Sequence, residues 1–212
     1  MVNFIVANGE IINYEWHRQV LLGGEIICAD GGANHAYQMG ILPQLVIGDL
    51  DSLTPLVKDW LVQNKVPILA AACTKDETDT MLAINWLTDN RVGLTEIIIL
   101  GAFGRRLDHT MGNIQLLLTG IKKEIKIRLI SEEQAVSLIT PEWPGEFSGQ
   151  GSCISLLAYT PEVKGVTTEN LQYPLAGATL TSDNPLGISN RLIAHQARVT
   201  VQAGILLAFE NN

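Results

Sequence analysis

The chain has no cluster of basic residues. Its 14 lysines and arginines are scattered and outnumbered by 22 acidic residues, which gives a formal net charge of −8 and a pI near 4.9. Binding to a nucleic-acid backbone requires a grouped positive face that can contact several phosphates. The composition therefore argues against nucleic acid as the main partner.

Long hydrophobic runs are also missing. No apolar stretch approaches the roughly 20 residues that a helix needs to cross a bilayer. Residues 1–10 lack the basic flank and the apolar core of a secretory signal peptide. We therefore expect a protein that neither spans a membrane nor is exported.

Cysteine is scarce and does not form pairs along the chain. Cys28, Cys73 and Cys153 are odd in number, far apart and set mostly among apolar residues. This arrangement is typical of buried thiols in a reducing compartment and not of a disulfide framework. It predicts a cytoplasmic location.

The two common nucleotide-binding fingerprints do not occur. There is no Gly-x-x-x-x-Gly-Lys-[Ser/Thr] phosphate loop and no Gly-x-Gly-x-x-Gly motif. Apolar residues make up 47% of the 212 positions, which is enough to bury a substantial core. The length fits one large domain or two small ones.

The first part of the chain alternates between two patterns. Short apolar runs predict strands at residues 4–7, 26–29, 45–47, 66–69, 97–100 and 125–130. Between them lie segments of helical period, of which residues 79–87 and 109–118 are the clearest. Such alternation is typical of βαβ units, so we predict a mostly parallel, three-layer α/β domain over residues 1–131.

The pattern changes between residues 131 and 152. Beyond this stretch, short strands separated by Pro and Gly are predicted at residues 153–158, 163–168, 178–181, 198–202 and 205–209. This spacing predicts an antiparallel β-sandwich or jelly-roll domain over residues 132–212. Residues 141–149 consist largely of turn-forming types and predict a connection into this domain.

Four groups of polar residues combine aspartate with glycine or basic side chains. They lie at residues 30–34, 48–52, 75–79 and 101–109, and at least the last three follow an apolar strand run. Parallel α/β folds bind ligands at the edge where such strands end, so the carboxylates should gather there. Asp49 and Asp51 would face the same side of an extended backbone. Converging carboxylates need a cation, and Mg²⁺ holding a polyphosphate fits best.

Each group taken alone also has a structural interpretation. Asp49 and Asp51 could form a solvated turn, and the spacing of Asp76 and Asp79 is that of a helix cap with a back-reaching acid. Asp108 could cap the next helix. The glycines at 31–32 and 101–104 could form ordinary tight turns or could present main-chain N–H groups to an anion. The occurrence of all four groups at successive strand ends favours a functional site.

The ordered set of motifs resembles the thiamine pyrophosphokinase family. The matching stretches, in chain order, are Asp30-Gly31-Gly32-Ala33-Asn34, Gly48-Asp49-x-Asp51-Ser52, Lys75-Asp76-x-Thr78-Asp79, Gly101-x-x-Gly104-x-Arg106-x-Asp108-His109 with Asn113, and Ser189-Asn190. The resemblance covers nearly the whole chain. It implies an α/β domain followed by a β-sandwich, a homodimer, and transfer of the pyrophosphoryl group of ATP to the hydroxyl of thiamine with release of AMP.

The resemblance also implies roles for individual residues. The implied ligands of Mg²⁺, or of Mn²⁺, are Asp49, Asp51 and Asp79, with Asp76 and Asp108 as further catalytic acids. The implied phosphate contacts are Lys75 and Arg106, together with the glycines Gly31, Gly101 and Gly104. The implied thiamine contacts are Tyr173, Ser189 and Asn190. Residues 1–131 would then bind ATP and Mg²⁺, whereas residues 132–212 would bind thiamine and form the dimer, with each site shared between two subunits.

Two positions depart from the family pattern, and two other functions stay open. Arg105 stands where a glycine is usual, and Asn170 replaces a glycine at a position where asparagine tolerates left-handed geometry. A metal-dependent glycosyltransferase that uses a nucleotide-sugar also employs an Asp-x-Asp motif, but this does not account for the later acidic groups. A non-catalytic nucleotide or thiamine sensor would have lost some of the acids, whereas this sequence keeps them all.

Overall fold

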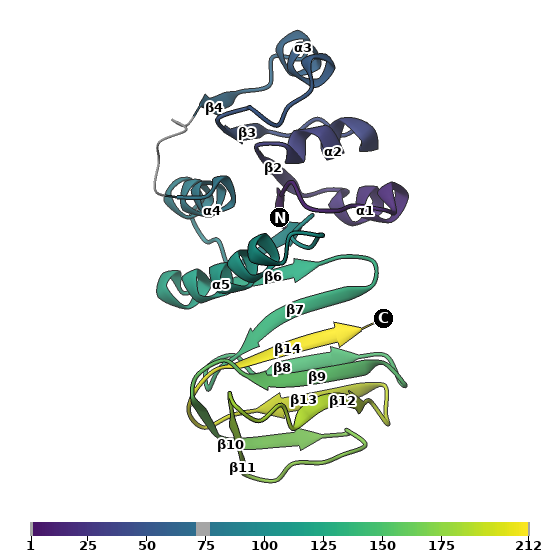
Figure 1. Cartoon of the computed structure of the whole chain (residues 1–212), viewed down its shortest axis with the longest axis vertical. Helices are drawn as coiled ribbons and strands as arrows, with labels where there is room; N and C mark the ends of the chain where they lie inside the picture. Colours follow the sequence, from purple (N-terminus) through teal and green to yellow (C-terminus); the bar gives the residue numbers. More distant parts are fainter. Residues whose placement is uncertain (1, 71–76, 212) are drawn as a thin grey trace. The chain divides into compact units, whose positions relative to one another are not determined.

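The computed structural model describes residues 2–70 and 77–211 (Figure 1). The chain divides into two compact units, Met1–Glu132 and Glu133–Asn212. The first unit combines helices with a parallel sheet, and the second consists of β-strands. These features confirm the predicted fold class.

The first unit is built on a six-stranded sheet in the order β6-β5-β1-β2-β3-β4, and every neighbouring pair is parallel. The strands are β1 (Asn3–Val6), β2 (Glu25–Ala29), β3 (Leu45–Gly48), β4 (Ile68–Ala70), β5 (Glu96–Leu100) and β6 (Lys126–Ile130). Each of the six predicted runs overlaps one of them. Apart from the first residues of β1, β2 and β5, which are Asn3, Glu25 and Glu96, the central strands are apolar because both of their faces are covered.

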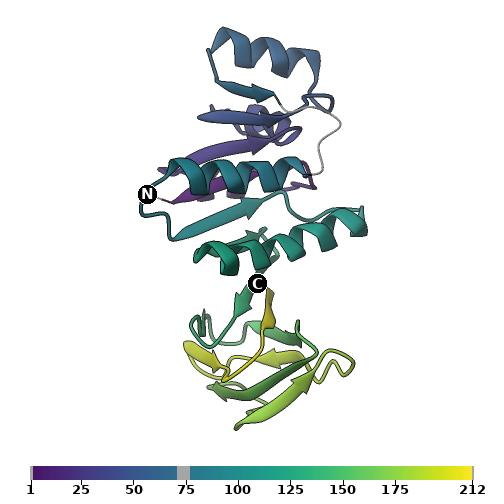
Figure 2. The same cartoon turned by 90° about the vertical axis from the view of Figure 1, so that its left-hand side faces the viewer.

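Helices cover the two faces of this sheet. They are α1 (Tyr14–Leu21), α2 (Gly32–Met39), α3 (Pro55–Gln63), α4 (Asp79–Asn90) and α5 (Leu107–Lys123). Helices α1 and α2 lie on one face, and α4 and α5 lie on the other (Figures 1 and 2). Alternate residues of β1 are buried on opposite faces, since Phe4 and Val6 join the core under α1 to α3 and Ile5 is fully buried outside that cluster. Among the described helices, none is both long enough and apolar enough to cross a membrane.

The second unit is a sandwich of two antiparallel sheets. One contains strands in the order β12-β9-β14-β7 and the other in the order β11-β10-β13-β8. Their bounds are β7 (Gln134–Ile139), β8 (Gly145–Ser148), β9 (Cys153–Ala158), β10 (Glu162–Glu169), β11 (Ala178–Thr181), β12 (Gly187–Arg191), β13 (Gln196–Thr200) and β14 (Leu206–Asn211). A single cluster of buried side chains, including Phe147, Leu156, Val166 and Val199, draws on both sheets and forms the core.

The expected connection over residues 141–149 is wrong in part. Gly145–Ser148 forms strand β8, which pairs with β13. Gly145 and Phe147 are buried and Glu146 and Ser148 are exposed, so the segment has the two-residue period of a half-buried strand. Because turn-forming residues lie on both sides of this short strand, its alternation could not be recognised in the sequence.

The caps of α4 and α5 are not the aspartates considered for that role, and Asp76, the expected cap of α4, lies outside the described residues. Thr78 caps α4 through its hydroxyl, which accepts a hydrogen bond from the Met81 amide at 3.3 Å, so that Asp79 is the first residue of the helix. In α5 the cap position is Arg106, and Asp108 lies inside the first turn. Asp79 and Asp108 thus lie in the first turns of their helices, where a carboxylate interacts favourably with the positive end of the helix dipole.

Candidate active site

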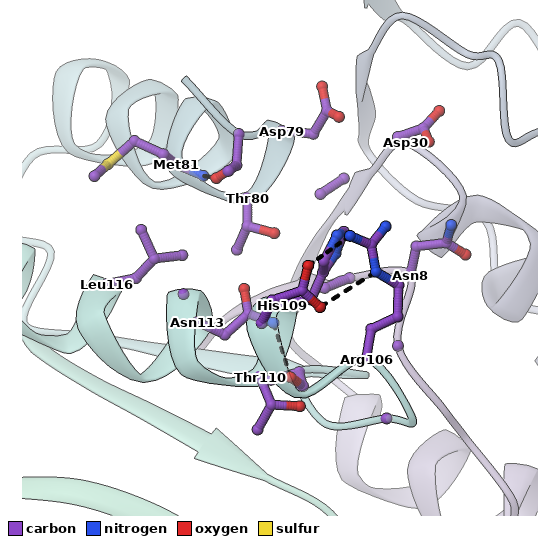
Figure 3. A pocket seen from close by; sticks show the side chains of 18 of the residues that line it. Asn8, Asp30, Asp79, Thr80, Met81, Arg106, His109, Thr110, Asn113 and Leu116 are labelled. Atoms are coloured by element: carbon purple, nitrogen blue, oxygen red, sulfur yellow. Dashed lines mark hydrogen bonds and ion pairs between the residues drawn. The ribbon is translucent and has the colours of Figure 1, made fainter. Parts of the chain in front are cut away.

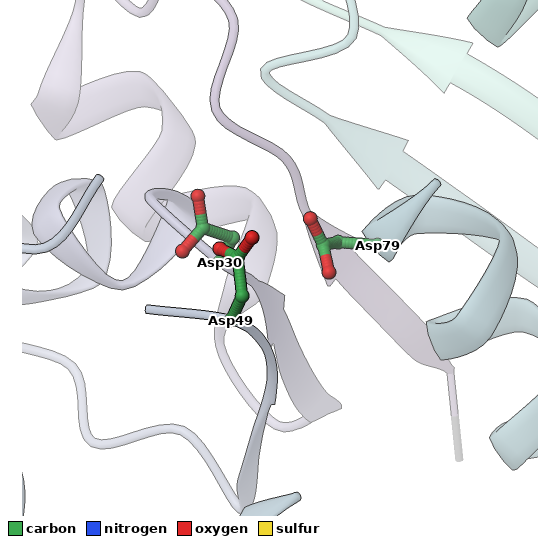
Figure 4. Close-up of side chains that lie close together, drawn as sticks. All are labelled: Asp30, Asp49 and Asp79. Atoms are coloured by element: carbon green, nitrogen blue, oxygen red, sulfur yellow. The ribbon is translucent and has the colours of Figure 1, made fainter. Parts of the chain in front are cut away.

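Three aspartates meet at the carboxyl edge of the first unit's sheet. Asp30 directly follows β2, Asp49 directly follows β3, and Asp79 begins α4. One carboxylate oxygen from each lies within 4.8 Å of the other two (Figure 4). Adjacent and opposite ligands of an octahedral Mg²⁺ are roughly 3 and 4 Å apart, because each bond is about 2.1 Å long. The three carboxylates therefore need only a small inward movement to share one ion.

Gly48 makes this convergence possible. A Cβ atom at this position would lie 2.8 Å from the Asp30 Cβ and 3.1 Å from an Asp79 carboxylate oxygen. The backbone of Gly48 also has φ +155°, a conformation that residues with a side chain rarely adopt. The last residue of β3 thus leaves room for the acids of two neighbouring segments.

Asp30 has the surroundings expected of a metal ligand. The residue is only 7% exposed, and its Oδ1 atom is buried without a hydrogen-bond partner. A buried carboxylate without a partner is costly, and two further acids beside it add charge repulsion. A bound divalent cation removes both costs. The donor set, composed of oxygens alone, suits Mg²⁺ or Mn²⁺.

The predicted metal ligands and the observed group overlap only in part. Asp49 and Asp79 belong to both, whereas Asp51 is exposed and lies outside the group of three. The Asp51 carboxylate accepts a hydrogen bond from the Ser52 hydroxyl at 2.9 Å, and the main-chain amide of Asp51 donates to Asp49 Oδ1 at 3.3 Å. The predicted residues Lys75 and Asp76 lie outside the described parts of the chain.

Arg106 and Asp108 form a forked ion pair at the start of α5. Arg106 Nη2 lies 2.5 Å from Asp108 Oδ2, and Arg106 Nε lies 3.3 Å from Asp108 Oδ1. This hydrogen-bonded guanidinium lowers the pKa of the Asp108 carboxyl, and the carboxylate in turn raises the pKa of Arg106. Both side chains are about two-thirds exposed. The pair keeps Asp108 ionised and makes it a poor acceptor for a proton.

These groups line a cavity of about 1220 Å³. Asp30, Asp79, Arg106 and His109 face it, as does Asn8 from the loop after β1 (Figure 3). The described residues that line the cavity carry the carboxylates of Glu10, Asp30, Asp49, Asp51, Glu77, Asp79 and Asp108 and the basic groups of Arg105, Arg106 and Lys122. Because acids prevail, a polyphosphate could enter only together with cations.

One wall of the cavity, called the floor below, is formed by the loops after β1 and β5, which meet through main-chain hydrogen bonds. The amide of Gly9 donates to the Gly101 carbonyl at 2.7 Å, and the amide of Glu10 donates to the Phe103 carbonyl at 2.6 Å. A Cβ on Gly9 would meet both of these carbonyl oxygens at 2.3 Å. Gly101 has φ +63°, and a Cβ there would lie 2.4 Å from the Ala7 carbonyl oxygen. The loops after β1 and β5 therefore lie as close together as two backbones can.

The other two glycines predicted to contact phosphate also border this region. Gly31 lies at the start of α2, where a Cβ would collide with the Asn8 side chain at 2.3 Å, and Gly104 lines the cavity itself. Arg105, the departure from the family pattern, also lines the cavity, and its Nε lies 3.9 Å from Glu10 Oε1. Its side chain is 91% exposed, so the guanidinium can turn toward an anion.

The predicted thiamine contacts lie together in the second unit. Asn190 is 6% exposed. Its side-chain Oδ1 accepts from the main-chain amide of Tyr173 at 3.0 Å, and its Nδ2 donates to the Tyr173 carbonyl at 2.8 Å. Tyr173 itself is 62% exposed. Ser189 has φ +61° and donates its amide to the Ser155 hydroxyl at 3.1 Å. The side chain of Asn190 therefore holds the backbone that presents the tyrosine ring. At Asn170, φ is +61°, as its left-handed tolerance predicted.

Sequence reasoning gave no role to Asp30 or to Asn8. Asp30 was treated as part of a glycine turn, although its position after a predicted strand was the same signal that identified Asp49. Asn8 follows β1 in the same way, and its side chain lies against Gly31. A rule that takes every polar residue just after a parallel strand would have found both.

His35 binds the main chain at the cavity floor, and its burial should make the stability of the first unit depend on pH. The Gly9 carbonyl can only accept, so His35 Nε2 donates to it at 2.8 Å, and Nδ1 then accepts from the Tyr14 hydroxyl at 3.0 Å. Burial lowers the pKa of His35. A pKa lowered by folding stabilises the protein above the unfolded value of about 6.5, and this stability is lost as the pH falls toward the folded value.

We therefore expect the free energy of unfolding to fall between pH 7.5 and pH 5.5, and to fall less in His35→Gln. Urea denaturation of both proteins at the two pH values measures the difference. Equal pH dependence in the two proteins would show that His35 does not carry it.

Two family models and several known proteins match the chain. The family model described as the thiamin pyrophosphokinase catalytic domain matches residues 23–129, and the model described as the thiamin pyrophosphokinase vitamin B1 binding domain matches residues 124–206. The chain belongs to the thiamine pyrophosphokinase family. It is 31% identical over 182 residues to the thiamine pyrophosphokinase of Bacillus subtilis, covering 85% of this chain and 84% of the relative.

Other relatives extend the match. The chain is 27% identical over 203 residues to thiamine pyrophosphokinase 1 of Oryza sativa, covering 85% of this chain and 76% of the relative. The crystal structure of the Bacillus subtilis enzyme superposes with a TM-score of 0.87 at 29% identity, covering 100% of this chain and 99% of that one. Thiamine pyrophosphokinases are transferases that make thiamine diphosphate, so the predicted family and enzyme class are confirmed. Neither the glycosyltransferase nor the sensor is supported.

Proposed function

We propose that this chain transfers the pyrophosphoryl group of ATP to the hydroxyl of thiamine, giving thiamine diphosphate and AMP, in a reaction that depends on Mg²⁺. The observation that carries the proposal is the group of Asp30, Asp49 and Asp79, whose buried Asp30 oxygen lacks a partner, at the edge of a cavity that also contains arginines. This is the arrangement that a metal-bound polyphosphate requires.

Asp30, Asp49 and Asp79 would hold the metal ion. Asp51 would be a further ligand on the exposed side of this group. When bound, Mg²⁺ would neutralise the phosphate oxygens and the charge that develops on them during transfer. Mn²⁺ prefers the same oxygen ligands and would substitute for it.

The residues of the chain mainly position the two substrates. The thiamine hydroxyl oxygen forms a bond to the β-phosphorus, the bond from that phosphorus to the oxygen bridging to the α-phosphate breaks, and AMP leaves with the electron pair. Arg106 and Lys75 would contact phosphate oxygens, and Gly31, Gly101 and Gly104 let the main chain approach them. Because such a transfer passes through a loose transition state, the thiamine hydroxyl needs little help from a general base to lose its proton. The lowered pKa of Asp108 argues against this residue as a strong base and favours a role in holding Arg106.

The second unit would supply the thiamine site, with Tyr173 as an aromatic surface for the substrate rings. Aromatic faces attract cations such as the thiazolium. The two hydrogen bonds from Asn190 to the backbone of Tyr173 support this role because they fix the residue while leaving its ring exposed. Ser189 lies on the same strand, β12.

Tyr173→Ala should raise the KM for thiamine about tenfold, since a stacked aromatic is worth roughly 1 kcal/mol or more. The KM for ATP should stay within about twofold, because a substrate platform acts on binding of its own substrate. Steady-state kinetics with each substrate varied in turn measures both constants. Tyr173→Phe keeps the ring and should behave like the parent protein. Equal effects of Tyr173→Ala on both KM values would contradict the assignment.

We further propose a homodimer whose sites combine residues of both subunits. Large apolar side chains are exposed on the second unit at Tyr173, Leu186, Ile188 and Ile193, which is unusual for a surface that faces only water. Sedimentation velocity of the pure protein tests the dimer. The buried Cys28 and the half-buried Cys153 are both free thiols, and they support the predicted cytoplasmic location.

The direct test of the reaction is to incubate the protein with ATP, thiamine and Mg²⁺, with and without EDTA, and to separate the products by chromatography. Equal amounts of AMP and thiamine diphosphate, formed only without EDTA, are expected. ADP in place of AMP would mean transfer of a single phosphoryl group. Binding of both substrates without product would instead support the sensor.

A further inference from the structure

Asn34 joins two loops that carry metal-site aspartates. It lies in α2, four residues after Asp30, and is half-buried. Its Nδ2 donates to the Ser52 carbonyl at 3.0 Å, and its Oδ1 accepts from the Thr54 amide at 3.2 Å. Ser52 and Thr54 belong to the loop between β3 and α3, which begins with Asp49. One side chain therefore uses both ends of its amide to hold this loop against α2.

The loop needs such support because its own geometry is unfavourable. Leu50 has φ +64°, a left-handed conformation that costs a non-glycine residue roughly 1–2 kcal/mol. Two hydrogen bonds that main-chain amides of the loop donate within it are long, at 3.3 Å from the Asp51 amide to Asp49 Oδ1 and 3.4 Å from the Leu53 amide to the Leu50 carbonyl. Strained residues keep their conformation only where the surroundings hold them. The two hydrogen bonds to Asn34 are shorter than both of these.

We propose that Asn34 is a positioning residue that fixes Asp49 in register with Asp30, so that the two carboxylates meet one metal ion. The inference rests on the proposed function for the identity of the metal site, but it concerns a side chain that lies outside that site. Residues that orient metal ligands affect metal affinity by about 10- to 100-fold. Asn34 should therefore act on the metal more than on thiamine.

The test uses three variants of the full chain. Asn34→Ala removes both hydrogen bonds, and Asn34→Asp keeps the acceptor for the Thr54 amide while losing the donor to the Ser52 carbonyl. Asn64→Ala is the matched control, because Asn64 Nδ2 likewise donates to a backbone carbonyl, that of Trp60, at 2.8 Å. Titration with Mn²⁺ followed by electron paramagnetic resonance measures metal affinity without substrates. The Mg²⁺ concentration that gives half-maximal velocity and the KM for thiamine are measured in parallel.

We expect Asn34→Ala to weaken Mn²⁺ binding and to raise the half-maximal Mg²⁺ concentration about 10-fold or more, with the KM for thiamine unchanged. Asn34→Asp should show a smaller shift in the same direction, and Asn64→Ala should show none. Unchanged Mn²⁺ affinity in Asn34→Ala, or a change confined to the KM for thiamine, would overturn the proposal. Loss of folding in both Asn34 variants would also overturn it, because the residue would then be structural. If the parent protein makes no thiamine diphosphate, the proposed function fails while the Mn²⁺ titration still decides the role of Asn34.

Discussion

Replacing Asp30 by asparagine is expected to remove most of the turnover and at the same time to stabilise the metal-free protein. The substitution deletes one metal ligand charge, which should lower kcat by on the order of 100- to 1000-fold. It also deletes a buried charge whose Oδ1 has no partner and that lies within 4.8 Å of two other carboxylates. Asparagine accepts the φ of +44° found at this position, so the backbone should not change.

The stability gain can be estimated from the repulsion that is removed. Two unit charges 4.8 Å apart repel by roughly 3 kcal/mol at an effective dielectric constant of 20. Part of this is screened, so a gain of about 1–2 kcal/mol and a rise in Tm of about 2–8 °C in EDTA are expected. Asp51→Asn is the matched control, since it neutralises an exposed acid outside the group of three and should leave the Tm unchanged. A lower Tm for Asp30→Asn in EDTA would show that the carboxylate is structural.

A methyl group at Gly48 should be almost as damaging to activity by a different route. The added Cβ would press on Asp30 at 2.8 Å and on Asp79 at 3.1 Å and would separate the two acids. Displacement of reacting groups by about 1 Å can cost about 100-fold in rate. Gly48→Ala should therefore lower kcat about 100-fold and destabilise the fold by roughly 1–3 kcal/mol.

Gly93→Ala separates crowding from backbone strain. Gly93 also has a positive φ, of +74°, but a Cβ there meets nothing within 4 Å. This variant should lose some stability and keep its turnover. Activity assays and thermal denaturation of the two variants measure the difference. Full turnover in Gly48→Ala would mean that the spacing of Asp30 and Asp79 does not matter to the reaction.

The sequence predicted the α/β layer well because its strands are buried on both faces and read as uninterrupted apolar runs. β3 follows this pattern over its whole length, and β1, β2 and β5 follow it after a polar or charged first residue. The placement of Asp49 at a strand end followed from the same runs. A strand that is covered on both faces can be recognised from its apolar run alone, without knowing which strands it pairs with or in which register.

The second unit was less predictable because its strands are half-exposed and irregular. In β12 only Asn190 is buried, the pairing with β9 shifts register, and Ser189 has a left-handed φ, so no regular alternation exists. β8 has two buried residues, one of them a glycine. At the site, the position of Asp30 after a predicted strand was readable from the sequence, but its assignment as a metal ligand depends on burial and on the absence of a partner for Oδ1. Neither property is visible in residue order.

The main-chain floor of the cavity also limits how the protein can diversify. Gly9 and Gly101 leave no room for a side chain, so no substitution at these two positions can reshape the floor without moving β1 against β5. The rim is different, because Arg105, Arg106 and His109 are exposed and can be exchanged at little cost to folding. A new nucleotide preference, whether evolved or engineered, would therefore arise more readily at exposed rim positions such as Arg105 and His109, which can vary while the fold is kept.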